Sequence, residues 1–361
     1  MHTTRFQTAA GIATLLAAMT GCSPDAAAPS AACAGKRDLR ASGSSAQAAA
    51  MTRFITSYEN ACPGHSLDYT SNGSGAGVAE FAAGLTDFGA SDSPIAPASE
   101  DWAKARARCG GSTPWNLPLV FGPIAVTYNV FGVDTLTLDA STTAKIFTGR
   151  ITSWDAPEIA ALNPDQQLPR QPIVVFFRSD DSGTTDNFQQ YLQAAAGAAW
   201  GRGAGKAFQG GVGRGRRGNE GTSAEIAPTP GSITYTEWSF AQRQQLPVAR
   251  IITSAGSDPV PLSVDTVTAS ISDIRIKGSG NDLTLDLSGL YQPGRGGAYP
   301  IVLATYEVVC SRYPDPQTAE AIKTFLEAAL TIGQDGLTEI GYVPVTPSIA
   351  GRLTAAIAAM T

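Results

Sequence analysis

Residues 173–196 read IVVFFRSDDSGTTDNFQQYLQAAA, and this stretch decides the fold class. The β-branched and aromatic run from Ile173 to Phe177 predicts a strand. A polar turn occupies residues 178–185, and the pattern from about Asp186 to Ala196 predicts a helix. A strand followed by a Ser, Thr and Gly-rich turn and a helix is typical of an α/β sheet.

The same unit occurs twice near the start of the chain. Residues 38–41 predict a strand, Ser44 and Ser45 a polar cap, and residues 46–61 a helix with apolar residues at helical spacing. The next unit consists of an extended segment at 66–70, the glycine-rich turn 72–77 and a helix at 78–83, and residues 87–92 then predict a short strand ending in a loop. We therefore expect an α/β fold.

Three such turns together indicate an anion site. A helix N-terminus presents unpaired N–H groups and the positive end of the helix dipole, and glycines let a ligand approach the backbone. In open α/β sheets these turns line a crevice at the carboxyl ends of the strands. Any single Ser or Thr is more often a cap of its own helix. Three turns, with Arg178 beside the third, favour oxyanion binding.

The amino-acid composition excludes several classes of function. A length of 361 residues predicts about two domains at roughly 150 residues each. The net charge of -6 gives no general attraction to nucleic acid. Of the two histidines, His2 lies at the chain start and His65 stands alone, so His-rich zinc sites and Ser-His-Asp catalysis lack their residues. We expect no metal, no cofactor and no nucleic-acid partner.

The N-terminal segment predicts export and anchoring. Arg5 precedes an apolar run from Ala9 to Met19, which is too short to span a bilayer and is typical of a signal peptide at residues 1–21. Gly21-Cys22 resembles a lipobox, although Met19 stands where Leu is more usual. We expect Cys22 to be lipidated and residues 22–35, rich in Ala, Pro and Ser, to form a flexible tether. The alternative is a freely secreted protein.

With Cys22 reserved for lipid, four cysteines remain in an oxidising compartment: Cys33, Cys62, Cys109 and Cys310. Two disulfides are expected, and three pairings are possible. Because Cys62 and Cys109 follow neighbouring predicted helices, Cys62–Cys109 with Cys33–Cys310 is the favoured pairing. A metal cluster is the rival, but no CxxC spacing supports it.

Five segments in chain order resemble the phosphate-binding lipoprotein of bacterial high-affinity phosphate ABC importers, actinobacterial type. They are NGSGAG at 72–77, DFGASD at 87–92, ITSWDAPEIAALNP at 151–164, FRSDDSGTTDNFQQYL at 177–192 and YPIVLATYEVV at 299–309. The resemblance runs from about Leu39 to Thr361, and the RSDxSGTT block is its most specific part.

The resemblance implies a two-lobed periplasmic-binding-protein fold with phosphate held between the lobes. Residues 36–122 and 301–361 would form lobe one, and residues 123–300 lobe two. The protein would sit lipid-anchored on the outer face of the cytoplasmic membrane and deliver phosphate to an ABC permease. The implied phosphate-binding residues are Ser44, Ser45, Ser74, Asp92, Arg178, Asp180, Ser182, Gly183 and Thr184.

These residues suit an anion that carries a proton. Arg178 offers a planar donor fork that Asp180 can hold in place, while hydroxyls and backbone N–H groups add neutral donors. Asp92 would repel an anion unless it accepts the O–H of hydrogen phosphate. Many relatives have Thr-Phe at the first turn, so the contribution of Ser45 stays open.

Alternative functions are an extracytoplasmic phosphatase using the same anion pocket, a sulfate or molybdate receptor, and a structural lipoprotein. A phosphatase needs a nucleophile with a base or a metal, and His65 has no HxxxH or HxxE partner. A faint P-loop pattern at 201–206 lacks Ser or Thr after Lys206 and is expected to be a surface loop. Residues 210–221, with several arginines and glycines, are expected to form a mobile solvated loop.

Overall fold

Eight strands form one curled sheet, in the order β2-β1-β3-β13-β4-β8-β6-β7. The computed structural model describes residue 2 and residues 33–361. The strands of this sheet are β1 Asp38–Gly43, β2 Ser66–Thr70, β3 Phe88–Ser91, β4 Pro114–Asn129, β6 Val174–Arg178, β7 Arg214–Arg216, β8 Ser232–Glu237 and β13 Val302–Cys310. Smaller sheets join β5 Thr137–Asp139, β9 Arg250–Thr253 and β10 Gly256–Val260, and β11 Arg275–Ile276 with β12 Leu285–Asp286.

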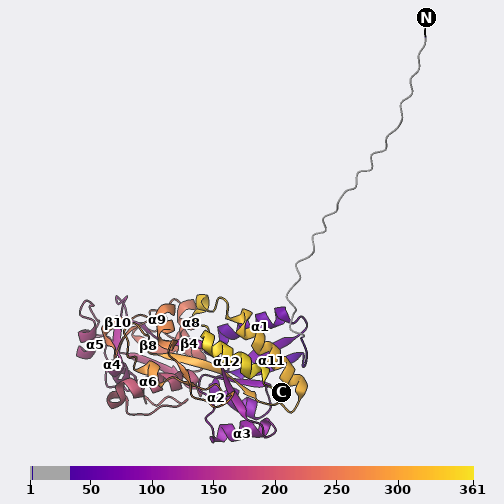
Figure 1. The fold of residues 1–361 in the computed structure, drawn as a ribbon. Coiled ribbons are helices and arrows are strands. Elements are labelled where there is room, and N and C mark those ends of the chain that lie inside the picture. The colour runs from indigo at the N-terminus through magenta and orange to yellow at the C-terminus, as the bar shows by residue number, and fades with distance from the viewer. Residues whose placement is uncertain (1, 3–32) are drawn as a thin grey trace.

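Helices surround the sheet along the length of the molecule (Figure 1). Their bounds are α1 Ala48–Ala61, α2 Ser74–Ala82, α3 Glu100–Arg108, α4 Ala140–Phe147, α5 Pro157–Leu162, α6 Gly183–Trp200, α7 Gly218–Ala224, α8 Trp238–Arg243, α9 Val264–Ile271, α10 Ser288–Tyr291, α11 Pro316–Leu330 and α12 Pro347–Ala358. One end of the elongated molecule carries α1, α3 and α11, and the other carries α4, α5 and β10 (Figure 1). The predicted α/β, two-lobed fold is confirmed.

The 16-residue strand β4 belongs to both halves of the sheet. Residues 114–123 of β4 pair antiparallel with β13, from Pro114 opposite Cys310 to Pro123 opposite Val302. From Ile124 onward the same strand pairs with β8 instead. The chain therefore passes between the halves as continuous strand. The exact lobe boundaries expected at 122/123 and 300/301 stay a prediction.

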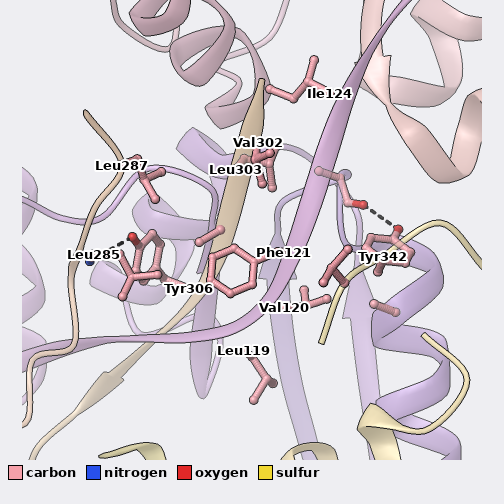
Figure 2. Packing of buried hydrophobic residues seen from close by; sticks show 14 of the residues in the cluster. Leu119, Val120, Phe121, Ile124, Leu285, Leu287, Val302, Leu303, Tyr306 and Tyr342 are labelled. Atoms are coloured by element: carbon pink, nitrogen blue, oxygen red, sulfur yellow. Dashed lines mark hydrogen bonds between the residues drawn. The ribbon is translucent and has the colours of Figure 1, made fainter. Parts of the chain in front are cut away.

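A hydrophobic core surrounds the two long strands (Figure 2). Phe121 from β4 and Leu303 from β13 are fully buried in it. The phenol of Tyr306 accepts a hydrogen bond from the Leu285 N–H at 3.2 Å, while that of Tyr342 donates to the carbonyl of Ala46 at 2.6 Å. Burial of apolar surface stabilises the fold by roughly 25 cal/mol per Å² removed from water. These strands are thus held rigidly on both sides.

Two helices begin earlier than the sequence pattern predicts. Helix α2 starts at Ser74, after Gly73 with a φ of 103°, and not at residue 78. Helix α6 starts at Gly183, capped by the Ser182 hydroxyl, and not at residue 186. Glycines weaken the helical pattern at both starts. Consequently Ser74, Gly183 and Thr184 lie in the first turns of helices.

The prediction of a mobile solvated loop at residues 210–221 is wrong. Strand β7 pairs in parallel with β6, and α7 follows it directly. Arg216 pairs with Glu225 at 2.5 Å and lies over the ring of Phe176. The Arg216 side chain is therefore held in place by an ion pair and by a ring contact within the fold. Residues 201–206, expected to be a surface loop, contain neither helix nor strand.

Two disulfides form, as predicted, but the favoured pairing is wrong. The bonds are Cys33–Cys62 and Cys109–Cys310, with Cα–Cα distances of 5.5 and 5.4 Å. Cys62 and Cys109 both follow helices, but Cys109 faces the last residue of β13. Helix order along the chain did not reveal which strand end lies beside α3.

The signal peptide, the lipidation site Cys22 and most of the tether lie outside the described residues. Among residues 33–361, no helix combines the length and the apolar character that crossing a bilayer requires.

Candidate functional site

The carboxyl ends of six strands meet between the two lobes. Strands β1, β2 and β3 are mutually parallel, as are β6, β7 and β8, so the turns that follow them gather at common edges. The N–H of Gly75 donates to the carbonyl of Asp181 across the lobes at 2.9 Å. The hydroxyl of Ser93 likewise donates to Asp186 at 2.6 Å. The turns of the two lobes are thus in direct contact.

Arg178 lies at the centre of this junction, with its side chain 1% exposed. Its Nε and Nη2 atoms donate to the two carboxylate oxygens of Asp180 at 2.8 and 2.5 Å. Burial alone raises the pKa of Asp180, but Arg178 and the N–H of Gly218 outweigh it and lower the pKa. Nη1 of Arg178 is buried and has no hydrogen-bond partner among the described residues. Asp180 therefore fixes one edge of the guanidinium group, and the Nη1 donor has no partner among the described residues.

The N-terminus of α6 points into the same junction. The Ser182 hydroxyl accepts from the N–H of Thr185 at 3.1 Å, which caps the helix. A Cβ at Gly183 would lie 2.6 Å from the Cβ of Asp92, so only glycine fits at this close approach. The helix presents its first-turn N–H groups and positive dipole end here.

Asp92 is buried and faces four hydroxyl groups. Ser44 and Thr305 donate to Oδ1, the latter at 2.8 Å. Ser74 and Thr184 donate to Oδ2 at 3.4 and 3.3 Å. Burial raises the pKa of Asp92, opposed by the hydroxyls of Ser44, Thr305 and Thr184 and by Arg178. A carboxylate surrounded by rotatable hydroxyls can exchange one of these donors for the O–H of a ligand.

Ser45 does not contact Asp92 but joins the two lobes. Its hydroxyl accepts from the backbone N–H and the side-chain amide of Asn219 at 3.1 and 3.0 Å. All nine residues predicted from the resemblance are thus gathered at this junction. Their roles as phosphate ligands stay a prediction.

Three residues of the junction were missed by the sequence interpretation. Asn219 donates to Ser45 and, at 3.3 Å, to Thr184. Thr305 donates to Asp92, and the amide of Asn187 donates to the Asp92 carbonyl at 2.8 Å. Thr305 lies within a strand, where no turn signal marks it. Asn219 lies in the segment interpreted as a solvated loop, although its strand-turn-helix order resembles the other turns.

His65 lies away from this junction. It immediately precedes β2, whereas the turns of the site follow the strands. Its ring contacts Tyr58 edge to face, with centroids 6.1 Å apart. Helix α1 and β2 therefore hold His65 at the opposite edge of the parallel strands.

A two-lobed α/β fold with buried donors converging between the lobes defines a solute-binding protein of the periplasmic type. The model of the PBP superfamily domain matches residues 25–330. Phosphate-binding protein PstS 3 of Mycobacterium tuberculosis is 58% identical over 328 residues, which are 91% of this chain and 88% of that protein. The chain belongs to this family of phosphate-binding proteins, which confirms the resemblance.

Two further similarities extend over most of the chain. Phosphate-binding protein PstS 3 of Mycobacterium leprae is 53% identical over 367 residues, covering 99% of each protein. Among solved structures, the high-affinity periplasmic phosphate-binding protein PfluDING bound with phosphate aligns with a TM-score of 0.68 at 20% identity, covering 88% of this chain and 93% of that one. The structural match supports the fold.

Proposed function

We propose that this protein binds inorganic phosphate between its lobes and delivers it to a membrane ABC permease. The observation that carries the proposal is the buried guanidinium of Arg178, fixed by Asp180 and left with one unpartnered donor. A buried cation with a free donor favours an anionic ligand. The relatives' names, phosphate-binding proteins, identify the anion.

The proposed ligands are the nine residues named from the sequence. Arg178 supplies charge, and Asp180 fixes its fork. Ser182, Gly183 and Thr184 supply donors at the α6 N-terminus. Ser44 and Ser74 supply hydroxyls, and Ser45 lines the site where it contacts Asn219. Asp92 accepts a hydrogen bond from the O–H of hydrogen phosphate.

A sulfate or molybdate receptor is less compatible with Asp92. Fully ionised sulfate has no O–H, so a carboxylate facing it leaves two acceptors opposed. A phosphatase finds no support in the relatives, which are named phosphate-binding proteins, and His65 lies at the other edge of the strands.

The family's extracytoplasmic role and the N-terminal sequence support a protein outside the cytoplasm. We further propose that Cys22 carries the lipid that anchors it to the outer face of the cytoplasmic membrane. Cell fractionation of a Cys22→Ala variant tests this: the variant should leave the membrane fraction, and its retention there with unchanged mobility would contradict the anchor.

Calorimetric titration of ligand-stripped protein with phosphate, arsenate and sulfate tests the binding function. Phosphate and arsenate should bind and sulfate should not, and a chromogenic phosphate ester should not be turned over. Replacing Arg178 by Ala should weaken phosphate binding by roughly 2 to 5 kcal/mol, because a buried charge pair is broken. Exposed Arg214→Ala is the matched control and should bind normally. Native affinity in Arg178→Ala would place the site elsewhere.

A further inference from the structure

Glu307 is a fully buried acid behind the anion site. It lies on β13 opposite Ala90 of β3 and Leu117 of β4. Residues 305 and 307 of a strand point to the same face. Since Thr305 on that face donates to Asp92, the Glu307 carboxyl lies toward the floor of the site.

Neither carboxyl oxygen of Glu307 has a hydrogen-bond partner among the described residues. Among these residues, the one group that lowers its pKa is the neutral amide of Gln47, and no cation does so. A protonated Glu307 is neutral and needs no charged partner in this buried position. An ionised Glu307 would leave a buried charge unpaired, which is costly.

The surrounding charges oppose ionisation as well. The titratable groups that face Glu307 are Asp92, after β3, and Tyr69, from β2. Helix α1 contributes only the neutral amide of Gln47 through its N-cap, and β4 contributes Leu117. Within residues 33–361, no ion pair involves Glu307. Burial, with Asp92 adding to it against the opposing Gln47, raises the pKa of Glu307 to about 8.

A polar path joins Glu307 to the first anion-binding turn. Nε2 of Gln47 donates to the Tyr69 hydroxyl at 3.4 Å, and that hydroxyl donates to the Ser44 carbonyl at 2.7 Å. Ser44 in turn donates to Asp92. The protonation state of Glu307 therefore acts on the turn that carries Ser44 and on the charge near the ligand.

We propose that Glu307 is a positioning residue that supports phosphate binding while it carries a proton and opposes binding once it ionises. This inference rests on the proposed phosphate-binding function. A bound phosphate adds negative charge near Glu307 and strengthens its hold on the proton. Binding should therefore take up a proton, and affinity should fall as pH rises above about 8. The fall should approach tenfold per pH unit until the pKa of the bound state is reached.

The test compares wild type with Glu307→Gln by calorimetric phosphate titration from pH 7 to 9.5, in two buffers of different ionisation enthalpy. The amide is a neutral isostere of the protonated acid. At pH 7 the two proteins should bind within about threefold of each other. At pH 9 wild type should be about tenfold weaker than the variant, and only wild type should take up a proton from this group. Exposed Glu59→Gln is the matched control and should follow wild type.

The outcomes separate the two proposals. Parallel pH profiles for wild type and Glu307→Gln, or equal proton uptake, would overturn the role of Glu307 while phosphate binding stands. If wild type binds no phosphate at any pH, the proposed function fails and this inference fails with it. The proton uptake of wild type at pH 8 requires no variant, so a misfolded variant does not remove the test.

Discussion

In the proposed site, Asp92 is the residue that we expect to determine anion selectivity. Its two oxygens accept from Ser44, Thr305, Ser74 and Thr184, so it already carries hydroxyl donors on both sides. Rotation of a hydroxyl toward a ligand leaves an acceptor that an incoming O–H can occupy. Hydrogen phosphate and hydrogen arsenate supply that O–H, and sulfate does not.

Asp92→Asn should gain sulfate binding and lose little phosphate affinity. An amide can donate as well as accept, so it satisfies either anion. Discrimination on the order of 10⁴ is reached when a site built for a hydrogen bond meets an analogue that lacks it, and the substitution should remove most of it. Competition of sulfate against labelled phosphate at fixed pH and ionic strength measures the change. Asp181→Asn, with an exposed carboxyl at the edge of the junction, is the control, and a variant that rejects sulfate as wild type does would refute proton recognition by Asp92.

At this scale, sequence reasoning was most successful where polar residues follow strands. Ser44 directly follows β1, Arg178 ends β6, and Ser74 begins the helix after β2; the structure gathers all three. Thr305 and Glu307 could not be found in this way, because they alternate with apolar residues inside β13 and belong to the site only through its register with β3.

At the scale of elements, the turn after β1 and the start of α7 form a polar contact between the lobes. Ser45 accepts two hydrogen bonds from Asn219. The amide oxygen of Asn219 is held by the Thr236 hydroxyl at 3.2 Å and the Glu237 N–H at 3.0 Å. Asn219 is therefore oriented by β8 before it reaches the opposite lobe.

A double-mutant cycle with Ser45→Ala and Asn219→Ala tests this contact. Each single variant should weaken phosphate binding by about 1–3 kcal/mol, because a buried group loses its partner. The double variant should be less impaired than the sum, with a coupling of about 0.5–3 kcal/mol. Phosphate affinity and dissociation rate by stopped flow are the measurements, with thermal unfolding as the control for the fold. Strictly additive losses would mean that the two residues act independently.

The starts of α2 and α6 show why element boundaries escaped the sequence pattern. Ser74-Gly75-Ala76-Gly77 has few helix-favouring side chains, yet it is helical. A Cβ at Gly73 would lie 2.5 Å from the Asp180 carboxylate of the other lobe. Tertiary contact across the lobes, and not local propensity, thus sets this helix start.

At the scale of the whole molecule, the two disulfides close chain segments of very different length. Cys33 and Cys62 are 29 residues apart, whereas Cys109 and Cys310 are 201 residues apart. The longer bond joins Cys109, the residue after α3, to Cys310, the last residue of β13. The chain segment that it closes contains all strands of the second half of the sheet. In a chain-entropy model the longer closed segment constrains the unfolded chain more.

Removal of Cys109–Cys310 should therefore destabilise the protein more than removal of Cys33–Cys62. The same relation gives about 5 kcal/mol for the longer loop and about 3.6 kcal/mol for the shorter one. Paired Cys→Ser variants compared by denaturant unfolding measure the order, and phosphate affinity should change little in either. Equal losses, or a larger loss from the shorter loop, would show that native-state contacts and not chain entropy dominate.

The overall fold was predictable because strand-turn-helix units and the resemblance to a known family agree along most of the chain. The disulfide pairing was not, since it depends on which helix end faces which strand end across hundreds of residues. Residues 210–221 were misinterpreted because glycine and arginine are typical of loops, and only packing against Phe176 and Glu225 turns Arg216 into a structural residue.

The link between the lobes also affects how the protein survives digestion. Peptidases bind their substrates as extended segments with a free backbone edge, which exposed loops provide. The crossings at β4 and β13 offer no such edge, because both strands are buried and hydrogen-bonded into the sheet. Cleavage there requires the sheet to open first, whereas the loop that carries Phe131, a residue that is 91% exposed, is accessible in the folded state. Cleavage by a peptidase is therefore directed to peripheral loops, and the two halves stay joined.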